Sequence, residues 1–186
     1  MSDRPLTQQR LVASLASLLT TIPQSTVLPF LKAFWATMAR QWTLLDVLRM
    51  DKYLLLVRRY LSASFEWLKK NNWEEKFVEE HSRMLEGEGG VLNPTATVPD
   101  GLRYHVLDCS VDELSKVDQE RVLSEAVLEL LMRPIRELTV RGRTRVLRER
   151  AKEVMKDKRL ENWAAGEGDE GKDELNEDEE WEGIKD

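Results

Sequence analysis

Apolar residues recur at every third or fourth position along most of the first 160 residues. In residues 5–20 the recurring positions are Leu11, Leu15, Leu18 and Leu19. In residues 26–42 they are Leu31, Trp35, Met38 and Trp42, with Phe30 and Phe34 alongside. This spacing places each set on one face of an α-helix, and it therefore predicts an all-α protein.

The same spacing predicts further helices over residues 44–70, 72–85, 118–132 and 143–158, and one more that begins after Pro99. Asn72 is placed to cap the helix over 72–85, and Glu75 would complete a capping box. We expect Pro134 to break or kink the chain, because proline cannot donate a backbone hydrogen bond. The glycines of residues 86–98 predict a flexible loop that is longer than most connections.

Successive amphipathic helices with short connections are typical of stacked antiparallel helical hairpins. Two architectures fit the pattern. One is a HEAT-like solenoid, and the other is an irregular helical bundle, since the sequence contains no strict repeat. We expect the helical domain to span residues 1–160, including the loop over 86–98. Residues 161–186 are rich in acids and poor in apolar side chains, which predicts a disordered acidic tail.

The formal net charge of −6 is the sum of two unequal parts. Residues 166–186 hold eleven acids and two lysines, so this segment carries −9. The other 165 residues hold 26 basic and 23 acidic side chains, which gives +3. The sequence is therefore that of a mildly basic body with an acidic tail.

Several classes of protein are excluded or disfavoured by the sequence. Cys109 is the single cysteine, so no internal disulfide can form. No uninterrupted apolar stretch approaches 18 residues, which excludes a membrane-spanning helix. The N-terminus lacks the apolar core of a signal peptide. We therefore expect neither a secreted protein nor an integral membrane protein.

Patterns that would indicate an enzyme are also missing. His105 and Cys109 share a helix face at i, i+4, but His81 is the only other histidine, so a metal site lacks ligands. The glycines of 87–90 are not followed by the Lys-Ser/Thr pair of a phosphate-binding loop. We expect no catalytic residue, no cofactor, no metal and no small-molecule substrate.

The strongest electrostatic feature is residues 133–159, which hold eleven basic and four acidic side chains. Such a cluster attracts phosphate groups, and arginine grips phosphate oxygens in pairs. A solvated helix face with internal salt bridges explains the cluster equally well. The candidate RNA or partner contacts in this segment are Arg141, Arg143, Arg145, Arg148 and Lys152.

The tryptophans fall into two groups. Trp35, Trp42, Trp67 and Trp73 lie on predicted helical stripes, where burial in the core is the more frequent role. Trp181 lies instead among acids, where no core can form. It is either an anchor for a basic, grooved partner or a residue without a role.

Residues 30–75 carry a specific combination of motifs. They are Phe34-Trp35, Trp42, the series Asp46-Val-Leu-Arg49-Met-Asp51-Lys52-Tyr53, the pair Arg58-Arg59, and Trp73. Together they resemble the eukaryotic ribosomal-RNA-processing protein 1 family. Ser2-Asp3-Arg4-Pro5 and Pro99-Asp-Gly101-Leu-x-Tyr-His105 are similar to further family segments, so the resemblance covers about 150 residues.

The resemblance implies a helical, HEAT-like scaffold of the nucleus and nucleolus that acts without catalysis. It implies partners among the assembly factors of the large-subunit precursor, possible contact with pre-ribosomal RNA, and no contact with a membrane. Family members usually carry a helical segment before the block that begins at Ser2, so this chain resembles a shortened member. Because solenoids need polar end caps, we expect the first helix to expose an apolar face.

Within this resemblance the motif residues have two alternative roles. The set to which we assign a structural role is Phe34, Trp35, Trp42, Asp46, Arg49, Asp51, Lys52, Tyr53 and Trp73. The alternative for the charged members is a docking surface, to which Arg58 and Arg59 are assigned as candidate contacts. The leading hypothesis is a non-catalytic scaffold of large-subunit biogenesis. The second is a protein-only helical adaptor whose acidic tail masks its basic helix.

Overall fold

The computed structural model describes residues 5–95, 97–161 and 163, and every regular element in these ranges is helical. The elements in chain order are α1 (Pro5–Ala16), α2 (Leu18–Thr21), α3 (Gln24–Gln41), the 3-10 helix η1 (Trp42–Leu44), α4 (Val47–Lys70), α5 (Glu75–Glu86), α6 (Asp100–Val117), α7 (Glu125–Arg141), α8 (Arg145–Met155) and α9 (Lys158–Glu161). None of these helices is long and apolar enough to cross a lipid bilayer. The all-α prediction is confirmed.

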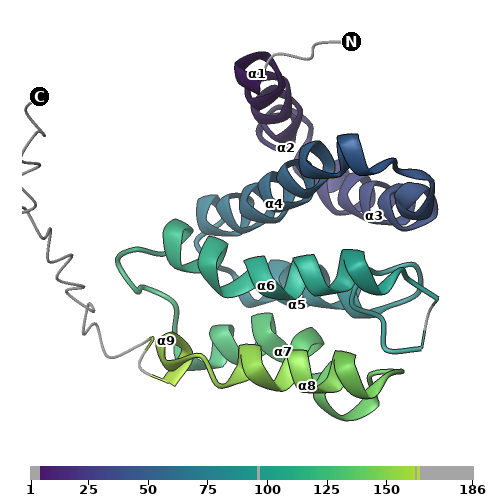
Figure 1. Cartoon of the computed structure of the whole chain (residues 1–186). Coiled ribbons are helices and arrows are strands. Elements are labelled where there is room, and N and C mark those ends of the chain that lie inside the picture. The colour runs from purple at the N-terminus through teal and green to yellow at the C-terminus, as the bar shows by residue number, and fades with distance from the viewer. Residues whose placement is uncertain (1–4, 96, 162, 164–186) are drawn as a thin grey trace, which may run out of the picture.

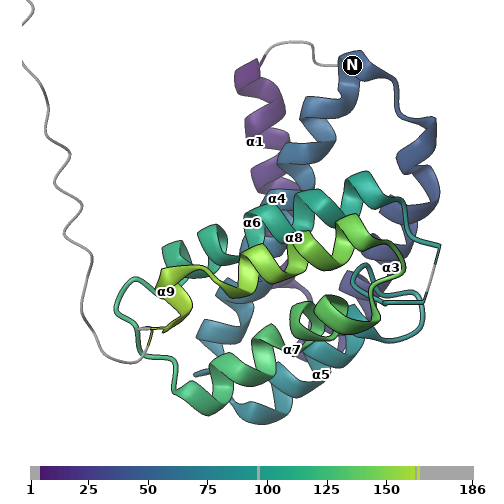
Figure 2. The ribbon, with the colours of Figure 1, turned by 60° about the horizontal axis from the view of Figure 1, so that its bottom comes forward.

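Two rows of helices form the molecule (Figure 1). One row stacks α1, α4, α6 and α8, and the other stacks α3, α5 and α7. Consecutive long helices form hairpins that run from one row to the other, so each hairpin lies on the previous one (Figure 2). This is the solenoid-like stack of helical hairpins predicted from the periodicity. The arrangement leaves α1 at one end and α8 at the other.

The core is a continuous layer between the two rows of helices. Its largest fully buried side chains are Trp35, Trp163, Arg103, Leu19, Leu31, Leu61, Leu68, Leu92, Leu102, Leu107, Leu114 and Leu138. Ring stacking joins the first long hairpin, because Phe34 of α3 lies 3.9 Å from Tyr60 of α4, measured between ring centroids. Such contacts add to area burial in holding the hairpin closed.

The predicted start of the helix over 72–85 is wrong. The helix α5 begins at Glu75, its N-cap is Glu74, and no side chain caps it. Asn72 and Trp73 both have a φ of 53°, which places them in the turn that ends α4. Trp73 is buried there, and its burial explains why the turn holds this strained conformation. Tertiary packing therefore overrides the local capping signal.

Of the two outcomes predicted for Pro134, a break does not occur, because α7 continues through it to Arg141. Proline at 134 leaves the carbonyl of Leu130 without its helical donor. The hydroxyl of Ser82 on α5 donates to this carbonyl oxygen at 2.8 Å. The helix also starts later than expected, at Glu125, after an N-cap at Ser124. A contact between hairpins thus replaces the missing hydrogen bond.

The buried face of the first helix is not the one that the leucines suggest. Val12, Ala16 and Leu19 are buried, whereas Leu11 and Leu18 are exposed. Ser17 separates α1 from α2. The expected exposed apolar face on the first helix is present.

The loop over 86–98 is packed against the core in its described residues. Val91 and Leu92 are buried, and Asn93 donates hydrogen bonds to the last carbonyls of α5 at Glu86 and Gly87. A Cβ on Gly90 would lie 2.2 Å from the carbonyl oxygen of Leu85, so the tight return needs glycine. Gly90 therefore allows a close turn, a role that the sequence pattern did not indicate.

Trp163, three residues after the expected domain boundary at 160, is buried. The indole N–H of Trp163 donates to the buried carboxylate of Asp118 at 2.7 Å. The guanidinium of Arg121 stacks over the indole ring, 3.9 Å from its centroid. The rest of the predicted acidic tail, including Trp181, lies outside the described residues.

Candidate nucleic-acid and partner interface

The turn between α7 and α8 presents basic residues to solvent. Gly142 ends α7, and a Cβ there would lie 2.5 Å from the carbonyl oxygen of Leu138, so only glycine fits. Thr144 then caps α8, because its hydroxyl accepts a hydrogen bond from the N–H of Leu147 at 3.1 Å. Arg143 lies between these two fixed residues and is exposed.

Much of the basic cluster over 133–159 is neutralised within the molecule. Arg133 bridges α7 to α5 by contacting both Glu79 and Glu86. The other pairs are Arg136 with Glu129, Arg141 with Glu137, Arg150 with Asp108, Lys152 with Glu149, and Arg159 with Asp112 and Asp157. The alternative of a salt-bridged helix surface therefore describes a large part of this segment.

Five basic residues of the cluster have no carboxylate within 4.0 Å in the described part of the chain. They are Arg143, Arg145, Arg148, Lys156 and Lys158. Arg145, Lys152 and Lys156 lie at i, i+7 and i+11, on one face of α8. The pKa of Glu149 on this face is lowered, first by the hydrogen bond from Lys152 and then by the surrounding cations.

We define the basic face as Arg141, Arg143, Arg145, Lys152 and Lys156, which are all exposed. Two of these five residues form surface ion pairs, Arg141 with Glu137 at 3.3 Å and Lys152 with Glu149 at 3.1 Å. Pairs of this kind contribute about 1 kcal/mol or less, and salt screens them. A phosphate oxygen can therefore compete with the carboxylates for these side chains.

Arg148 was assigned to the same contacts, but the structure gives its guanidinium a local partner. Arg148 is half-buried and donates to the carbonyl oxygen of Gly142 at 2.7 Å. This bond closes the turn between α7 and α8. The side chain therefore positions its neighbours on the basic face, and it does not project with them.

The two candidate contacts on α4 lie in different surroundings. Arg58 is half-buried and contacts Glu113 of α6 at 2.6 Å and Asp112 at 3.5 Å. Burial alone would raise the pKa of Glu113, but hydrogen bonds from Lys116 and Arg58 outweigh it and lower the pKa. Arg58 thus joins two hairpins. Arg59 is exposed and remains a candidate contact.

The motif residues of the first hairpin are divided between the core and the surface. Trp35, Trp42 and Trp73 are buried, and Phe34 is half-buried against the ring of Tyr60. The carboxylate of Asp46 caps α4 by accepting from the N–H of Arg49 at 3.0 Å, and it also pairs with the Arg49 side chain. The Asp46–Arg49 pair therefore lies at the start of α4 and does not join two helices. The side chain of Asp51 is exposed. Lys52 and Tyr53 line a groove against α1.

No group of three or more metal-ligating side chains occurs among the described residues. His105 bonds through Nε2 to the carbonyl oxygen of Leu54 at 2.9 Å, and Cys109 is buried beside it. Burial is the main cause that raises the pKa of the Cys109 thiol. The pair packs α6 against α4.

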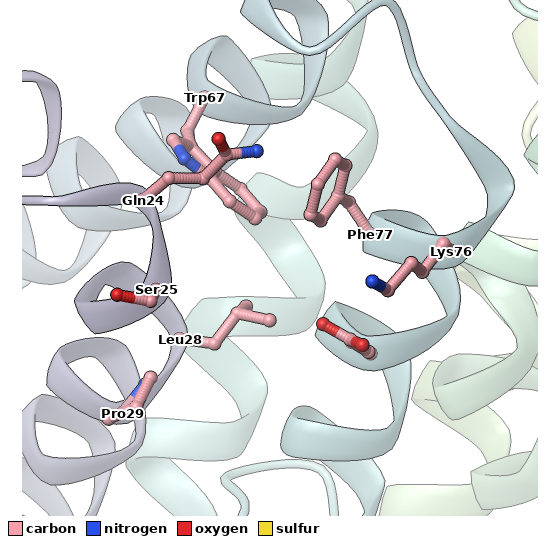
Figure 3. A pocket seen from close by; sticks show the side chains of 8 residues that line it. Gln24, Ser25, Leu28, Pro29, Trp67, Lys76 and Phe77 are labelled. Atoms are coloured by element: carbon pink, nitrogen blue, oxygen red, sulfur yellow. The ribbon is translucent and has the colours of Figure 1, made fainter.

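A cleft of about 640 Å³ separates α3 from α5 (Figure 3). Trp67 and Phe77 form one side of it, with their rings edge to face at 5.5 Å, and Gln24 and Leu28 lie opposite. Trp67 is buried, as its position on a helical stripe predicts, and it also lines this cleft. No sequence signal indicates the cleft, because the lining residues belong to three different helices.

Stacked helical hairpins of this kind define the class of solenoid-like all-α proteins. The chain belongs to the Nop52 family of nucleolar proteins, whose sequence profile matches residues 1–185. It is 39% identical over 132 residues to the human ribosomal RNA processing protein 1 homolog B, an alignment covering 70% of this chain and 17% of that protein.

Two further relatives extend the comparison. The human ribosomal RNA processing protein 1 homolog A is 36% identical over 135 residues, which cover 70% of this chain and 28% of the relative. The Drosophila melanogaster homolog is 29% identical over 158 residues, which cover 79% of this chain and 22% of the relative. The chain thus spans under a third of the length of these relatives. The family is one of nucleolar proteins, and these relatives are named for ribosomal RNA processing.

Proposed function

We propose that this chain is a non-catalytic scaffold in the assembly of the large ribosomal subunit. Its helix faces bind assembly factors, and its basic face contacts pre-ribosomal RNA. The observation that carries the RNA contact is the set of exposed cations on α8 and the preceding turn, where Arg143 and Arg145 have no carboxylate within 4.0 Å in the described residues. Membership of a nucleolar family supports the cellular setting.

The test is a double charge reversal, Arg143→Glu with Arg145→Glu. Both side chains are exposed, so the variant should fold. We expect RNA affinity near 100 mM salt to fall roughly tenfold or more, because two phosphate contacts become repulsive. The slope of log K against log salt should shrink by about 1.5 to 2. The same variant should be lost from large-subunit precursor particles on sedimentation.

The matched control is Lys32→Glu with Arg40→Glu on α3, which makes the same change in net charge at two exposed positions. It should leave RNA affinity within about twofold of wild type. An equal loss in both variants would mean that only net charge matters, and it would contradict a defined RNA face. Normal sedimentation of the Arg143/Arg145 variant with precursor particles would also reject the contact.

A second candidate function is a protein-only adaptor whose acidic tail masks the basic face. It is favoured by the −9 charge of residues 166–186, which follow the anchored Trp163 closely in sequence. Replacing Glu177, Asp178, Glu179 and Glu180 by their amides should then raise RNA affinity at low salt and have little effect at high salt. Unchanged affinity at every salt concentration would eliminate this function.

A further inference from the structure

The basic face, to which the proposed function assigns an RNA contact, contains a straight row of cations. Arg145 begins α8 and Lys156 is its C-cap, so the row between them is about 16 Å long at about 1.5 Å of rise per residue. Lys152 lies on the same side of the helix between the two ends. Leu147 and Ala151 are fully buried on the opposite side, and their burial fixes the row on the molecule.

The turn before α8 is held as firmly as the helix. Arg148 donates to the carbonyl oxygen of Gly142 at 2.7 Å, and the hydroxyl of Thr144 caps the helix. The exposed side chains of Arg141 and Arg143 therefore start from a fixed backbone. A fixed array of cations suits a ligand whose phosphates are also fixed, because little backbone freedom is then lost on binding.

These cations lie on an outer surface of the molecule. The helix α8 closes one end of the stack, where it packs against α7 and α6, and no described helix lies over its other side (Figure 2). Proteins that bind single strands generally hold the backbone in a basic groove. A helix that is exposed along its length is suited instead to lie against the outside of a double helix.

The aromatic rings near the basic face are already occupied within the molecule. The guanidinium of Arg150 lies over the ring of Tyr104, 4.7 Å from its centroid. Trp163 is buried, and the guanidinium of Arg121 lies over its ring at 3.9 Å. The sequence between His105 and Trp163 contains no aromatic residue. Unpaired bases bind proteins largely by stacking on such rings, so this surface offers them few contacts.

The charge of the basic face favours a duplex over a single strand. A double helix places about twice as many phosphates in a given length as one of its strands does. A short, rigid row of cations therefore releases more counterions from a duplex. A flexible single strand would also lose conformational entropy when its phosphates are aligned with the row.

We propose that the basic face binds double-stranded segments of RNA through their phosphates and without regard to sequence. Side chains cannot read bases in the narrow major groove of an RNA duplex, so contacts to the backbone and the shape of the helix dominate its recognition. Arg143 and Arg145 contact the duplex at one end of the row, and Lys152 and Lys156 contact it at the other. This inference rests on the proposed RNA contact and specifies the class of RNA that is bound.

The probes are two RNA duplexes of about twenty base pairs with unrelated sequences, and an oligouridine strand of the same length, which does not pair with itself. Fluorescence anisotropy with the full chain near 100 mM salt should give at least tenfold tighter binding of either duplex than of oligouridine. The two duplexes should bind within about twofold of each other. The salt dependence should be steeper for the duplexes, because each phosphate contact adds about 0.9 to the slope for a double helix and about 0.7 for a single strand.

A pair of matched variants tests the row itself. Lys156→Glu reverses the charge at its far end and should weaken duplex binding at least fivefold. Lys158→Glu makes the same change at an exposed residue of α9, two positions later and outside the row. It should change duplex affinity by no more than about twofold. An equal loss in both variants would mean that the row does not form the site, and it would overturn the proposal.

The outcomes separate this inference from the proposed function. Equal or tighter binding of oligouridine, or a difference of more than tenfold between the two duplexes, would overturn the assignment of sequence-independent duplex binding. In either case, weaker binding by the Arg143→Glu/Arg145→Glu variant would still support an RNA contact at the basic face. If none of the three RNAs binds the wild-type chain, both the RNA contact and this inference are wrong.

Discussion

His81 links the stability of the protein to pH through its burial. It is fully buried on α5, where Ser64 lies 3.2 Å from its Nε2, and Nδ1 has no hydrogen-bond partner in the described structure. Burial lowers the pKa of His81 from 6.5 to about 4. The folded protein therefore keeps the imidazole neutral at pH values where the unfolded chain protonates it.

The free energy of unfolding should consequently fall as pH drops below about 6.5, and the fall due to His81 should level off only below about pH 4. Between pH 7 and pH 4.5 we expect a loss of roughly 2.5 kcal/mol from His81 alone. Urea unfolding at the two pH values measures it. The His81→Gln variant should show a pH dependence smaller by about that amount, and an identical dependence would contradict the assignment.

Trp163 and Asp118 show how single residues define the end of the folded part. The buried carboxylate of Asp118 accepts from the backbone N–H groups of Val122 and Leu123 as well as from the Trp163 indole. A buried carboxylate is tolerated only with such partners. The loop after α6 and the segment after α9 are thus fixed by one side chain.

At the scale of elements, α7 depends on a neighbour for its continuity. The hydroxyl of Ser82 replaces the donor that Pro134 cannot supply to Leu130. Ser82→Ala should cost about 1 to 2 kcal/mol of unfolding free energy, because the Leu130 carbonyl then loses its partner. In a Pro134→Ala background the new backbone N–H can donate instead, and the same substitution should cost about 0.5 kcal/mol or less.

A double-mutant cycle by chemical denaturation measures this coupling, which we expect to be about 1 kcal/mol. Thr139→Ala supplies a control, since its exposed hydroxyl also bonds a carbonyl of α7, that of Arg136, without joining two helices. Its cost should be equal in both backgrounds. Additive costs for Ser82 and Pro134 would show that the hydroxyl does not substitute for the missing N–H.

At the scale of the whole molecule, the stacked arrangement predicts a gradient of local stability. The helix α6 is covered by α4 on one side and by α8 on the other. The principal neighbours of α1 are α4 and the short helix α2. Elements of a stack are stabilised by their nearest neighbours. The terminal helix should therefore open far more readily than the central ones.

Hydrogen exchange followed by mass spectrometry can resolve this gradient. We expect amides of α6 to exchange slowest and those of α1 roughly a hundredfold faster or more, which corresponds to about 3 kcal/mol. Leu48→Glu should leave the gradient unchanged, because Leu48 is exposed. Equal protection of α1 and α6 would mean that the stack opens as a single unit.

The sequence by itself determined the all-α class, because helical periodicity is local and survives in any packing. It left a HEAT-like solenoid and an irregular bundle both open, and the tertiary structure decided for the stack. The sequence also identified the family, since the Trp and Asp-Lys-Tyr motifs are contiguous in the chain. Only the tertiary structure decided that Asn72 is a turn residue, that Pro134 lies within a helix and that Val91 and Leu92 pack into the core. Each of these outcomes depends on a partner distant in sequence, such as Ser82 for Leu130.

The same limit applies to the candidate surfaces. The basic cluster can be recognised in the sequence from its many arginines and lysines. The carboxylate that neutralises Arg133 comes from α5, however, and the one that neutralises Arg58 comes from α6. Sequence could therefore not separate Arg58, which joins two helices, from Arg59, which is exposed. The groove between α1 and α4 was likewise absent from the sequence, apart from the expectation of an exposed apolar face. Long-range pairing decides these features, and local patterns do not encode it.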